Sequence, residues 1–382
     1  SLSPIRLGVI GLSTRGWASF AVVPPLFGPL LKDKYDLVAL CTTSAESAQA
    51  AGQKYKELAG HDIKTYHGEN GAAQLANDPN VDMVAVCVKM PDHLKTITPA
   101  LDAGKDVFVE WTPGANFQET LQIAEIVKKK KVRCLVGGQG KQSPVIRKLK
   151  ELVHSGQIGR VMSTSVIMAV NVGTHYWGPK IWQSSSYTAD ITKGATAISI
   201  QTGHFLVGLT EVLGEFKEIT ATTAVQFPEA DLVDANGQPT GEKIKNTSPE
   251  QISISGIVSG KPYSDLVFLN FHCRAALSPV KGREIFWWVI DGEEGSIVLV
   301  GRDGDRMGAH MHLSDPQLFL NGEEVAVDLT EIDKLGNIGK QWYEFARGES
   351  GYYTTIDDAV TIHRALEAVL ESSQKGKKVV LV

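Results

Sequence analysis

The residues with the clearest chemical purpose lie near the start of the chain, where an apolar run opens into a glycine-containing turn. Residues 5–10 read IRLGVI, and the six that follow read GLSTRG, from Gly11 to Gly16. In a dinucleotide-binding turn, the first glycine allows the sharp bend, the second lets the backbone approach the pyrophosphate, and the third allows close helix–strand packing. Ser13 replaces the middle glycine here, but it is small and its hydroxyl can donate to a phosphate.

We therefore predict that this turn binds a nicotinamide dinucleotide; the alternative is a plain strand–helix turn without a ligand. The expected contacts are Gly11, Leu12, Ser13, Thr14, Arg15 and Gly16.

The end of the second apolar run bears on which dinucleotide fits. An Asp or Glu there would hold the ribose 2′-hydroxyl of NAD, but the sequence reads Cys41-Thr42-Thr43-Ser44. Three hydroxyls, with Arg15 nearby, could instead accommodate a 2′-phosphate, and the missing carboxylate removes a repulsion against it. We therefore favour NADP, with NAD also possible, and expect Thr42, Thr43 and Ser44 to contact the cofactor.

The first third of the chain alternates short apolar runs with amphipathic stretches. Strands are expected at 5–10, 35–43, 62–66, 81–88, 106–111 and 132–138, and helices from about 18 and at 45–58, 92–103 and 118–130. Strand followed by helix, repeated at this spacing, predicts a doubly wound parallel sheet. We assign residues 1–140 to an α/β Rossmann domain.

The pattern changes near residue 140, where long strands with few helices replace the alternation. Strands are expected at 161–170, 216–226, 251–258, 265–273, 284–290 and 296–300, and helices at 143–155, 193–213 and 356–373. Residues 229–250 are polar and turn-rich, which is typical of a long surface loop or extended connection. We assign residues 141–382 to an α+β domain for substrate binding and oligomerisation, with a large, mostly antiparallel open sheet.

Composition excludes several classes of function. The 382 residues carry a net charge of −5, so no basic excess marks a nucleic-acid surface. No apolar run approaches the roughly 18 residues that span a bilayer, and no secretory signal is visible. The four cysteines form no C-x-x-C pair and the ten histidines look scattered, so we expect no metal site and a reducing, cytoplasmic setting.

Several segments, in the right order, resemble the Gfo/Idh/MocA family of glucose–fructose oxidoreductases and inositol dehydrogenases. They read VDMVAVCVKMPDH, ALDAGKDVFVEWTPG, LVHSGQIGRVMS, GREIFWWVIDGEEGSIVL and TTIDDAVTIHRALEAVLES. Four stretches, one of them inside a segment just named, resemble a fungal galactose-repressor-like subgroup whose repressor keeps the fold and binds the dinucleotide but acts as a regulator. These read GLSTRGWA, FVEW, GGQGKQSPVIRKLKEL and PEADLVDANGQPTGEKI.

The resemblance implies hydride transfer between the nicotinamide and a sugar, sugar derivative or related cyclic alcohol or ketone. The family's proton-handling residues are the lysine of an E-K-P motif and an Asp and a His four positions apart. Glu110 matches the glutamate, Trp111 stands at the lysine, His204 matches the histidine, and Ile200 stands at the aspartate. Two departures keep a second function open: a non-catalytic NAD(P)-binding regulator that acts through a protein partner.

In the oxidoreductase hypothesis, His204 is the acid–base residue, with an ordinary pKa near 6.5. Lys89 ends the fourth strand, where ligands bind in such sheets, and could replace the lost lysine by orienting the hydroxyl; the alternative is a solvated surface lysine. Trp111 is either an apolar wall of the site or core filling.

Further candidates complete the predicted site. Val88, Lys89, Pro91, His93, Glu110 and Trp111 are expected to contact the cofactor, and Lys89, Trp111, Lys141, Tyr176, Trp182, Asp190 and His204 the substrate. Each has a structural alternative: His93 caps or packs, Lys141 lies in solvent, the aromatic residues anchor their loop, and Asp190 caps a helix.

The expected partners are a small sugar-like molecule and further copies of the chain, with no nucleic acid or membrane. The apolar run at 285–290 indicates one face of an open sheet, which a second subunit usually covers. We expect a homodimer or homotetramer.

Overall fold

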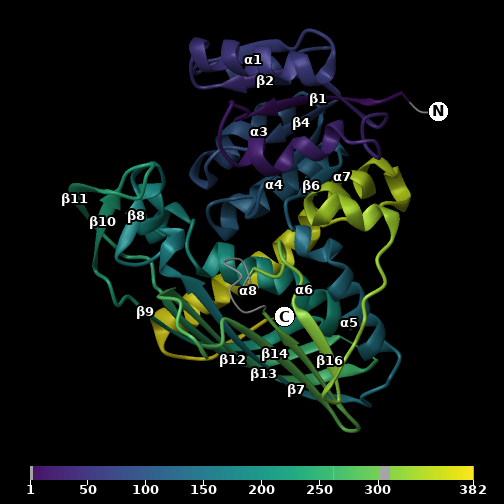
Figure 1. The fold of residues 1–382 in the computed structure, drawn as a ribbon, viewed down its shortest axis with the longest axis vertical. Helices are drawn as coiled ribbons and strands as arrows, with labels where there is room; N and C mark the ends of the chain where they lie inside the picture. The colour runs from purple at the N-terminus through teal and green to yellow at the C-terminus, as the bar shows by residue number, and fades with distance from the viewer. Residues whose placement is uncertain (1–2, 261, 302–309, 382) are drawn as a thin grey trace. The chain divides into compact units, whose positions relative to one another are not determined.

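The computed structural model describes residues 3–260, 262–301 and 310–381 (Figure 1). The chain forms two compact units, and each combines segments that are distant in sequence. The first unit holds the residues up to Gln142 together with Thr330–Val360, and the second holds Ser143–Leu329 together with Thr361–Val382. Because Thr330–Val360 returns to the first unit, a single boundary at residue 140 does not describe the two units completely.

The first unit is built on a six-stranded sheet in the order β3-β2-β1-β4-β5-β6. Its strands are β1 (Ile5–Ile10), β2 (Tyr35–Thr42), β3 (Lys64–His67), β4 (Met83–Val86), β5 (Asp106–Val109) and β6 (Cys134–Val136). All neighbours pair in parallel, so the predicted Rossmann architecture is confirmed. The strand order reverses between β1 and β4, and ligands bind outside the carboxyl ends of the strands at such a point.

Helices connect these strands. They are α1 (Ala45–Ala59), α2 (Gly71–Ala76), α3 (His93–Asp102) and α4 (Phe117–Lys130). The sequence pattern predicts α1, α3 and α4 but not α2, and the helix after β1 is shorter than expected. After the glycine turn, the expected helix is only the π-helical turn η1 (Ala18–Val22), followed by the 3₁₀ turn η2 (Pro24–Phe27). Pro24 and Pro25 stop the helix because they lack the amide hydrogens that would continue it.

The returning C-terminal segment completes the core of the first unit. It contains η9 (Glu331–Leu335) and α7 (Gly336–Ala346). Trp342 is fully buried, its indole N–H donates to the carbonyl of Val22 at 3.0 Å, and the Tyr35 hydroxyl donates to its carbonyl at 2.6 Å. Residues more than 300 positions apart thus share one core.

The second unit is dominated by a nine-stranded sheet in the order β17-β16-β15-β14-β7-β13-β12-β9-β18. Its strands are β7 (Val161–Asn171), β9 (Glu215–Ala224), β12 (Gln251–Gly260), β13 (Ser264–Leu277), β14 (Phe286–Gly292), β15 (Ser296–Val300), β16 (Gln317–Leu320), β17 (Glu323–Glu324) and β18 (Val379–Val380). Only β7 and β13 pair in parallel, so the expected large, mostly antiparallel sheet is confirmed.

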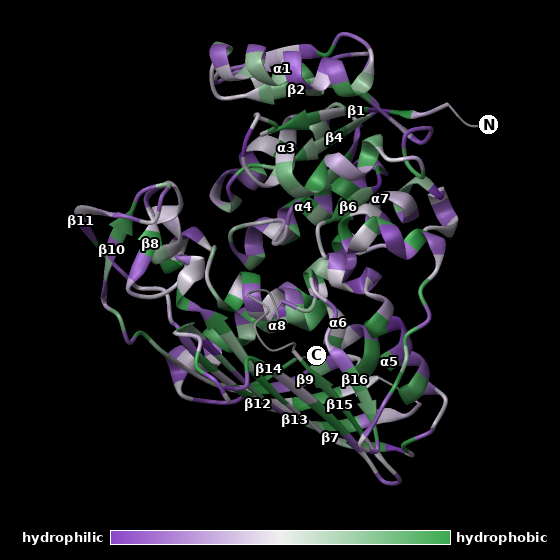
Figure 2. Cartoon of the chain, in the orientation of Figure 1, coloured by the Kyte–Doolittle hydropathy of each residue, from purple (hydrophilic) through white to green (hydrophobic). Residues whose placement is uncertain are grey.

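One face of this sheet carries the helices α5 (Pro144–His154), α6 (Gly203–Leu213) and α8 (Ile356–Lys375) (Figure 1). Phe205 of α6 meets Phe271 of β13 and Trp288 of β14, with ring centroids 5.5 and 5.1 Å apart. Apolar residues concentrate along the strands (Figure 2). The buried face of the sheet and these helices form the core of the second unit.

Two sequence-based expectations for the second unit are wrong. Residues 229–250 are not a loop: β10 (Glu229–Val233) and β11 (Pro239–Lys245) join β8 (Lys180–Trp182) in a small sheet. The Asp234 carboxylate accepts from the amides of Asn236 and Gln238, both at 2.9 Å, and so closes the hairpin turn. Because β11 is almost wholly exposed, its sequence lacks the alternation that marks a strand.

The helix expected at 193–213 is broken as well. The turn η7 (Ile191–Lys193) ends at Gly194, the π-helical η8 (Ile198–Thr202) follows, and α6 begins at Gly203. Gly194 has φ +81°, a left-handed conformation that ends a helix.

Within the described ranges, no helix is long and apolar enough to cross a membrane.

Candidate functional site

The glycine turn after β1 has the close backbone approach that dinucleotide binding requires. Gly11 has φ +90°, and a Cβ at this position would lie 2.2 Å from the carbonyl oxygen of Cys87, just beyond β4. Gly8, inside β1, leaves space for Leu75, which would be 2.7 Å from a Cβ there. Gly16 also has a positive φ, +92°, but its Cβ would meet open space. Only glycine fits at Gly11 without displacing backbone.

Ser13 closes the turn with its own hydroxyl. Its Oγ donates to the Arg15 carbonyl at 2.5 Å and accepts from the Arg15 amide at 3.2 Å. A hydroxyl has one proton, so in this conformation the proton stays within the turn. Lys54 of α1, which the sequence reasoning missed, reaches Ser19 Oγ at 2.8 Å and the Thr14 carbonyl at 3.4 Å.

The hydroxyl residues at the end of β2 differ in burial and in their hydrogen bonds. Thr42 is buried, and its hydroxyl donates to the Ser44 carbonyl at 3.0 Å. Ser44 caps α1, because its Oγ accepts from the Ser47 amide at 3.2 Å. Thr43 is exposed, and so is Arg15 in the glycine turn. Thr43 and Arg15 are therefore the members of this group best placed to meet a ligand.

His93, at the start of α3, ties together the segments that follow β4 and β5. It is 1% exposed, with Nδ1 2.8 Å from the Thr112 carbonyl and Nε2 3.1 Å from the Val88 carbonyl. Burial lowers the pKa of the ring, and a neutral imidazole donates through one nitrogen only. Both ring nitrogens face carbonyls, so this geometry supports the packing alternative. Lys89, close by, is exposed.

Glu110 follows β5, and its carboxyl group lies at the carboxyl ends of β5 and β6. Burial raises the pKa of Glu110 to about 7, against an opposing hydrogen bond from the Trp17 side chain. Within the described residues, its Oε1 is buried with no hydrogen-bond partner. A Cβ on Gly137, the residue after β6, would lie 2.7 Å from Oε2. Trp111, which follows, is 4% exposed.

These features fit a nicotinamide dinucleotide. The glycine turn has a backbone approach that a Cβ would block, and Glu110 holds a buried oxygen that needs a polar partner. An amide or hydroxyl group of a ligand could satisfy that oxygen.

Lys141, in the turn η4 (Gln139–Gln142) after β6, contacts other residues of the first unit and does not extend into solvent. Its Nζ lies 3.1 Å from an Asp358 carboxylate oxygen and 4.4 Å from the centroid of the Tyr352 ring. The side chain is 12% exposed. This lysine therefore links the end of β6 to the start of α8 within the first unit.

His204 lies in the first turn of α6, in the second unit, and belongs to a cluster of three histidines. Its ring stacks on His312 with centroids 3.9 Å and planes 5° apart, and His310 meets His312 edge-on at 5.6 Å. Burial, and then the charge of His310, lowers the pKa of His204 to about 3. The expected ordinary pKa is therefore wrong for this conformation.

The expectation that the histidines are scattered is also wrong for these three. The H-x-H spacing of His310 and His312 was the available sequence signal, but it did not show that His204 joins them. Among the residues that the structure describes, no group of His, Cys, Asp or Glu could hold a metal ion.

The remaining candidates lie around the small sheet of the second unit. The Trp182 indole donates to the Thr174 carbonyl at 2.9 Å, so this side chain anchors its loop. Asp190 caps η7 by accepting from the Thr192 amide at 2.9 Å and hydroxyl at 2.7 Å. Tyr176 is 41% exposed and keeps an accessible aromatic ring. The anchoring and capping alternatives thus have direct support for Trp182 and Asp190.

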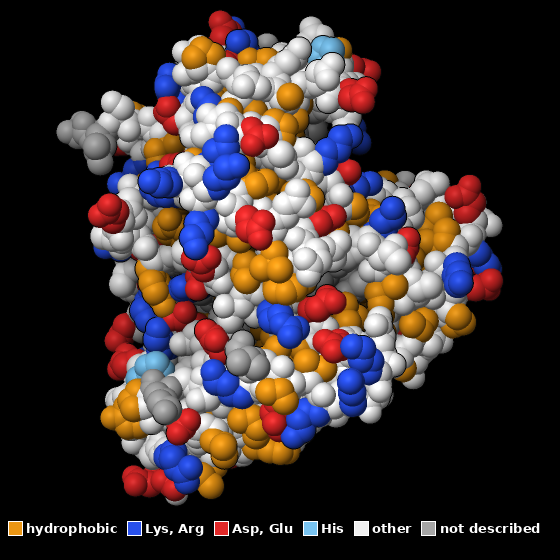
Figure 3. All heavy atoms as spheres, turned by 180° about the vertical axis from the view of Figure 1, so that it is seen from behind, with side chains coloured by type: hydrophobic (Ala, Val, Ile, Leu, Met, Phe, Trp, Pro, Cys, Tyr) orange, Lys and Arg blue, Asp and Glu red, His pale blue; other side chains and the backbone are white. Residues whose placement is uncertain are grey.

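One face of the molecule shows how its charged side chains are distributed. On the face in Figure 3, Lys and Arg side chains are interspersed with Asp and Glu.

Family models match one segment in each of the two units. Residues 5–138 match the oxidoreductase family with an NAD-binding Rossmann fold, and residues 144–301 match the Gal80p C-terminal domain. Together they define a Gfo/Idh/MocA-type protein with two domains. The chain belongs to this family, in the fungal Gal80-like subgroup.

Two curated relatives represent different functions. A dehydrogenase, AclE, from Aspergillus oryzae is 28% identical over 98% of this chain and 97% of its own length. The galactose/lactose metabolism regulatory protein GAL80 from Kluyveromyces lactis is 28% identical over 68% of this chain and 56% of its own length.

Solved structures show the same fold. A super-repressor mutant of Gal80p from Saccharomyces cerevisiae has a TM-score of 0.81 at 22% identity, covering 99% of this chain and 98% of its own. Levoglucosan dehydrogenase in complex with NADH and L-sorbose has a TM-score of 0.73 at 17% identity and full coverage of both chains. The fold is thus shared by regulators and enzymes.

The close approach at Gly11 can be tested by substitution. Gly11→Ala should weaken dinucleotide binding at least tenfold, because the new Cβ would displace the Cys87 carbonyl. Gly16→Ala is the matched control: its φ is equally positive but its Cβ meets open space, so we expect the smaller loss. Isothermal titration calorimetry with NADP⁺ and NAD⁺ measures both, and equal losses would contradict the role given to the close approach.

The buried carboxyl of Glu110 should make stability depend on pH. A folded-state pKa of about 7, above the ordinary value of 4.5, means that the folded protein holds this proton over an interval where the unfolded chain has lost it. Stability therefore falls as pH rises from about 4.5 to 7 and does not recover above it. Glu110→Gln should remove this contribution and stabilise the first unit by about 1–3 kcal/mol at pH 8.

Thermal melts of both proteins at pH 5 and pH 8 measure the effect. Glu119→Gln, for which no such burial applies, is the control. A Glu110→Gln melt that moves with pH as the wild type does would show that another group is responsible.

Proposed function

We propose that this protein is an NAD(P)-dependent oxidoreductase that transfers a hydride between the nicotinamide and a sugar, sugar derivative or related cyclic alcohol or ketone. The observation that carries the proposal is His204, a buried imidazole at the family's proton-transfer position, in a chain whose first unit has the dinucleotide turn. The match to dehydrogenase AclE over nearly its whole length supports it.

The dinucleotide, when bound, accepts or supplies the hydride. It would lie along the glycine turn and the segments after β2, β4 and β5, with Glu110 offering its buried oxygen to a polar group. The missing carboxylate at the end of β2, together with exposed Arg15 and Thr43, favours NADP.

His204 takes the substrate's hydroxyl proton as the hydride leaves. Burial keeps the imidazole neutral near pH 7, but a pKa of about 3 makes it a weak base, so the charge that develops on the substrate must raise this pKa for the proton to transfer. Lys89 orients the hydroxyl and stabilises developing negative charge on its oxygen. Trp111, which cannot carry a proton, contributes an apolar wall.

A second candidate function is a non-catalytic, dinucleotide-binding regulator that acts through a protein partner. Trp111 and Ile200 occupy two positions at which the family's enzymes carry proton-handling residues, and the C-terminal match to Gal80p favours this alternative.

Turnover over a panel of aldoses, polyols and glycosides, with NADP⁺ and NAD⁺, separates the two functions. We expect NAD(P)H production with at least one compound, and His204→Asn should lower kcat by about 10²–10⁴-fold while leaving cofactor affinity unchanged. Because the pKa of His204 is about 3, activity should not fall through protonation of this group between pH 8 and pH 5.

Two outcomes would contradict the proposal. Bound cofactor without turnover on any compound favours the regulator. Full activity in His204→Asn shows that another group moves the proton.

We also propose that the protein is a homodimer or homotetramer assembled through the outer face of the large sheet. Strand alternation puts several apolar side chains on the face opposite the helices, with polar residues such as Ser165 and Asn270 between them. The apolar residues are Ile167, Ile257, Leu266, Phe268, Trp287 and Val298. Phe268 is 50% and Leu266 66% exposed, which is typical of a surface that another protein covers.

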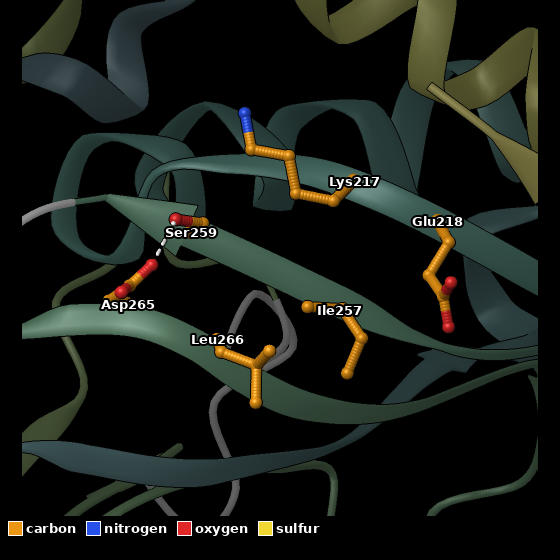
Figure 4. A pocket seen from close by; sticks show the side chains of 6 residues that line it. All are labelled: Lys217, Glu218, Ile257, Ser259, Asp265 and Leu266. Carbon is orange, nitrogen blue, oxygen red and sulfur yellow. Dashed lines mark hydrogen bonds between the residues drawn. The ribbon is translucent and has the colours of Figure 1, made fainter. Parts of the chain in front are cut away.

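A hollow at one end of this face has features that suit a second copy of the chain. It encloses about 770 Å³ and is lined by side chains of β9, β12 and β13 (Figure 4). Lys217 supplies a cation and Asp265 an anion, with Asp265 accepting from the Ser259 hydroxyl at 3.1 Å. A surface with both charges beside an apolar area can pair with itself across a twofold axis.

Phe268→Asp tests this assembly. We expect the wild type to sediment as a multiple of 41.3 kDa and the variant to shift towards a single chain, because a buried charge would face the partner. Leu58→Asp, an exposed position of α1, should leave the assembly unchanged. A wild type that sediments as one chain at micromolar concentration would overturn the proposal.

A further inference from the structure

The ring of His204 is covered on one side by another histidine that comes from a different part of the chain. His312 lies parallel to it, with centroids 3.9 Å and planes 5° apart. Both residues are buried, at 8% and 6% exposure. The terminal torsion of a histidine side chain has a broad range, and a ring stacked at this distance removes most of that freedom.

His312 is itself held firmly, because it belongs to a compact turn, residues 310–315. The amides of Leu313 and Ser314 both donate to the His310 carbonyl, at 2.8 and 3.0 Å. At the end of the turn, the Asp315 carboxylate accepts from the hydroxyl of Ser143 at 3.1 Å. Ser143 is the N-cap of α5, so the turn is fixed to a helix end.

The turn also packs against α6. The Met311 side chain is 2% exposed, and its methyl group would lie 3.5 Å from a Cβ on Gly208, one helical turn beyond His204. Ile146 of α5 would lie 3.1 Å from the same Cβ. Gly208 thus leaves the space in which the turn approaches α6 closely enough for His312 to reach His204.

We propose that His312 is a positioning residue, which holds the His204 imidazole in the plane from which it exchanges a proton with the substrate. This inference rests on the proposed function, because it gives His204 the role of proton acceptor. Restricting the ring before the substrate arrives keeps donor and acceptor in a reactive geometry, and small misplacements of such groups are costly.

The charges around His204 agree with this role. The pKa of His312 is lowered well below its ordinary value by burial and by the neighbouring rings of His204 and His310. Further along the same face of α6, Glu211 pairs with Lys150 of α5. Both stacked rings are therefore neutral near pH 7, so no repulsion between charges separates them.

Two substitutions distinguish stacking from simple filling of space. In H312A the ring is gone, so kcat should fall about 10–100-fold with little change in KM, and the pKa of His204 should rise from about 3 towards its ordinary value. H312F keeps a flat ring and should recover most of kcat. His363→Ala, a buried histidine of α8, is the control and should change neither quantity.

Steady-state kinetics and nuclear magnetic resonance titration of ¹³C-labelled histidine in the full chain give the two readouts. If H312A does not fold, H312N, which has no ring to stack, takes its place. The proposal is overturned if the ring-free variant leaves kcat and the pKa of His204 unchanged, or if folded H312F is as slow as the ring-free variant.

Failure of the proposed function gives a different result. In that case His204→Asn retains full activity, or no compound turns over at all, whereas the titration still reports whether His312 controls the environment of His204.

Discussion

The candidate cofactor site depends on one close approach, between the backbone at Gly11 and the carbonyl of Cys87. The Gly11 amide donates to Cys41 and the Cys87 amide donates to Ile10, both at 2.9 Å, so the end of β1 is held from both sides. A side chain at Gly11 would separate β1 from the segment after β4. The turn therefore keeps its conformation at the point where the strand order reverses.

Around that turn, buried polar groups set where the neighbouring segments lie. His93 contacts the carbonyls of Val88 and Thr112, and Glu110 is packed against Gly137. Burying such groups is costly unless partners satisfy them. One carbonyl accepts the single N–H of neutral His93. Within the described residues, Glu110 Oε1 has no hydrogen-bond partner, and this is why Glu110 carries the argument for a polar ligand.

The sequence predicted the elements whose burial leaves a periodic pattern, and missed those set by long-range packing. The strands β1, β4, β5 and β6 of the Rossmann sheet are largely buried and read as apolar runs, so the pattern predicted a parallel sheet. The exposed strand β11 has no such signal. The stacking of His312 on His204 joins residues 108 positions apart through a turn without periodicity, so only the folded chain shows it.

The stacking of His312 on His204 can be related to Ile200, which stands where the family's enzymes carry an aspartate. An Asp near His204 would raise the pKa of the imidazole and orient its ring by charge and hydrogen bonding. Ile200 stands at that position, and the pKa of His204 is instead low, at about 3. A parallel ring at 3.9 Å can fix the imidazole plane without adding a negative charge. Under the proposed function, packing by His312 would supply the orienting part of the carboxylate's role, while the imidazole stays neutral.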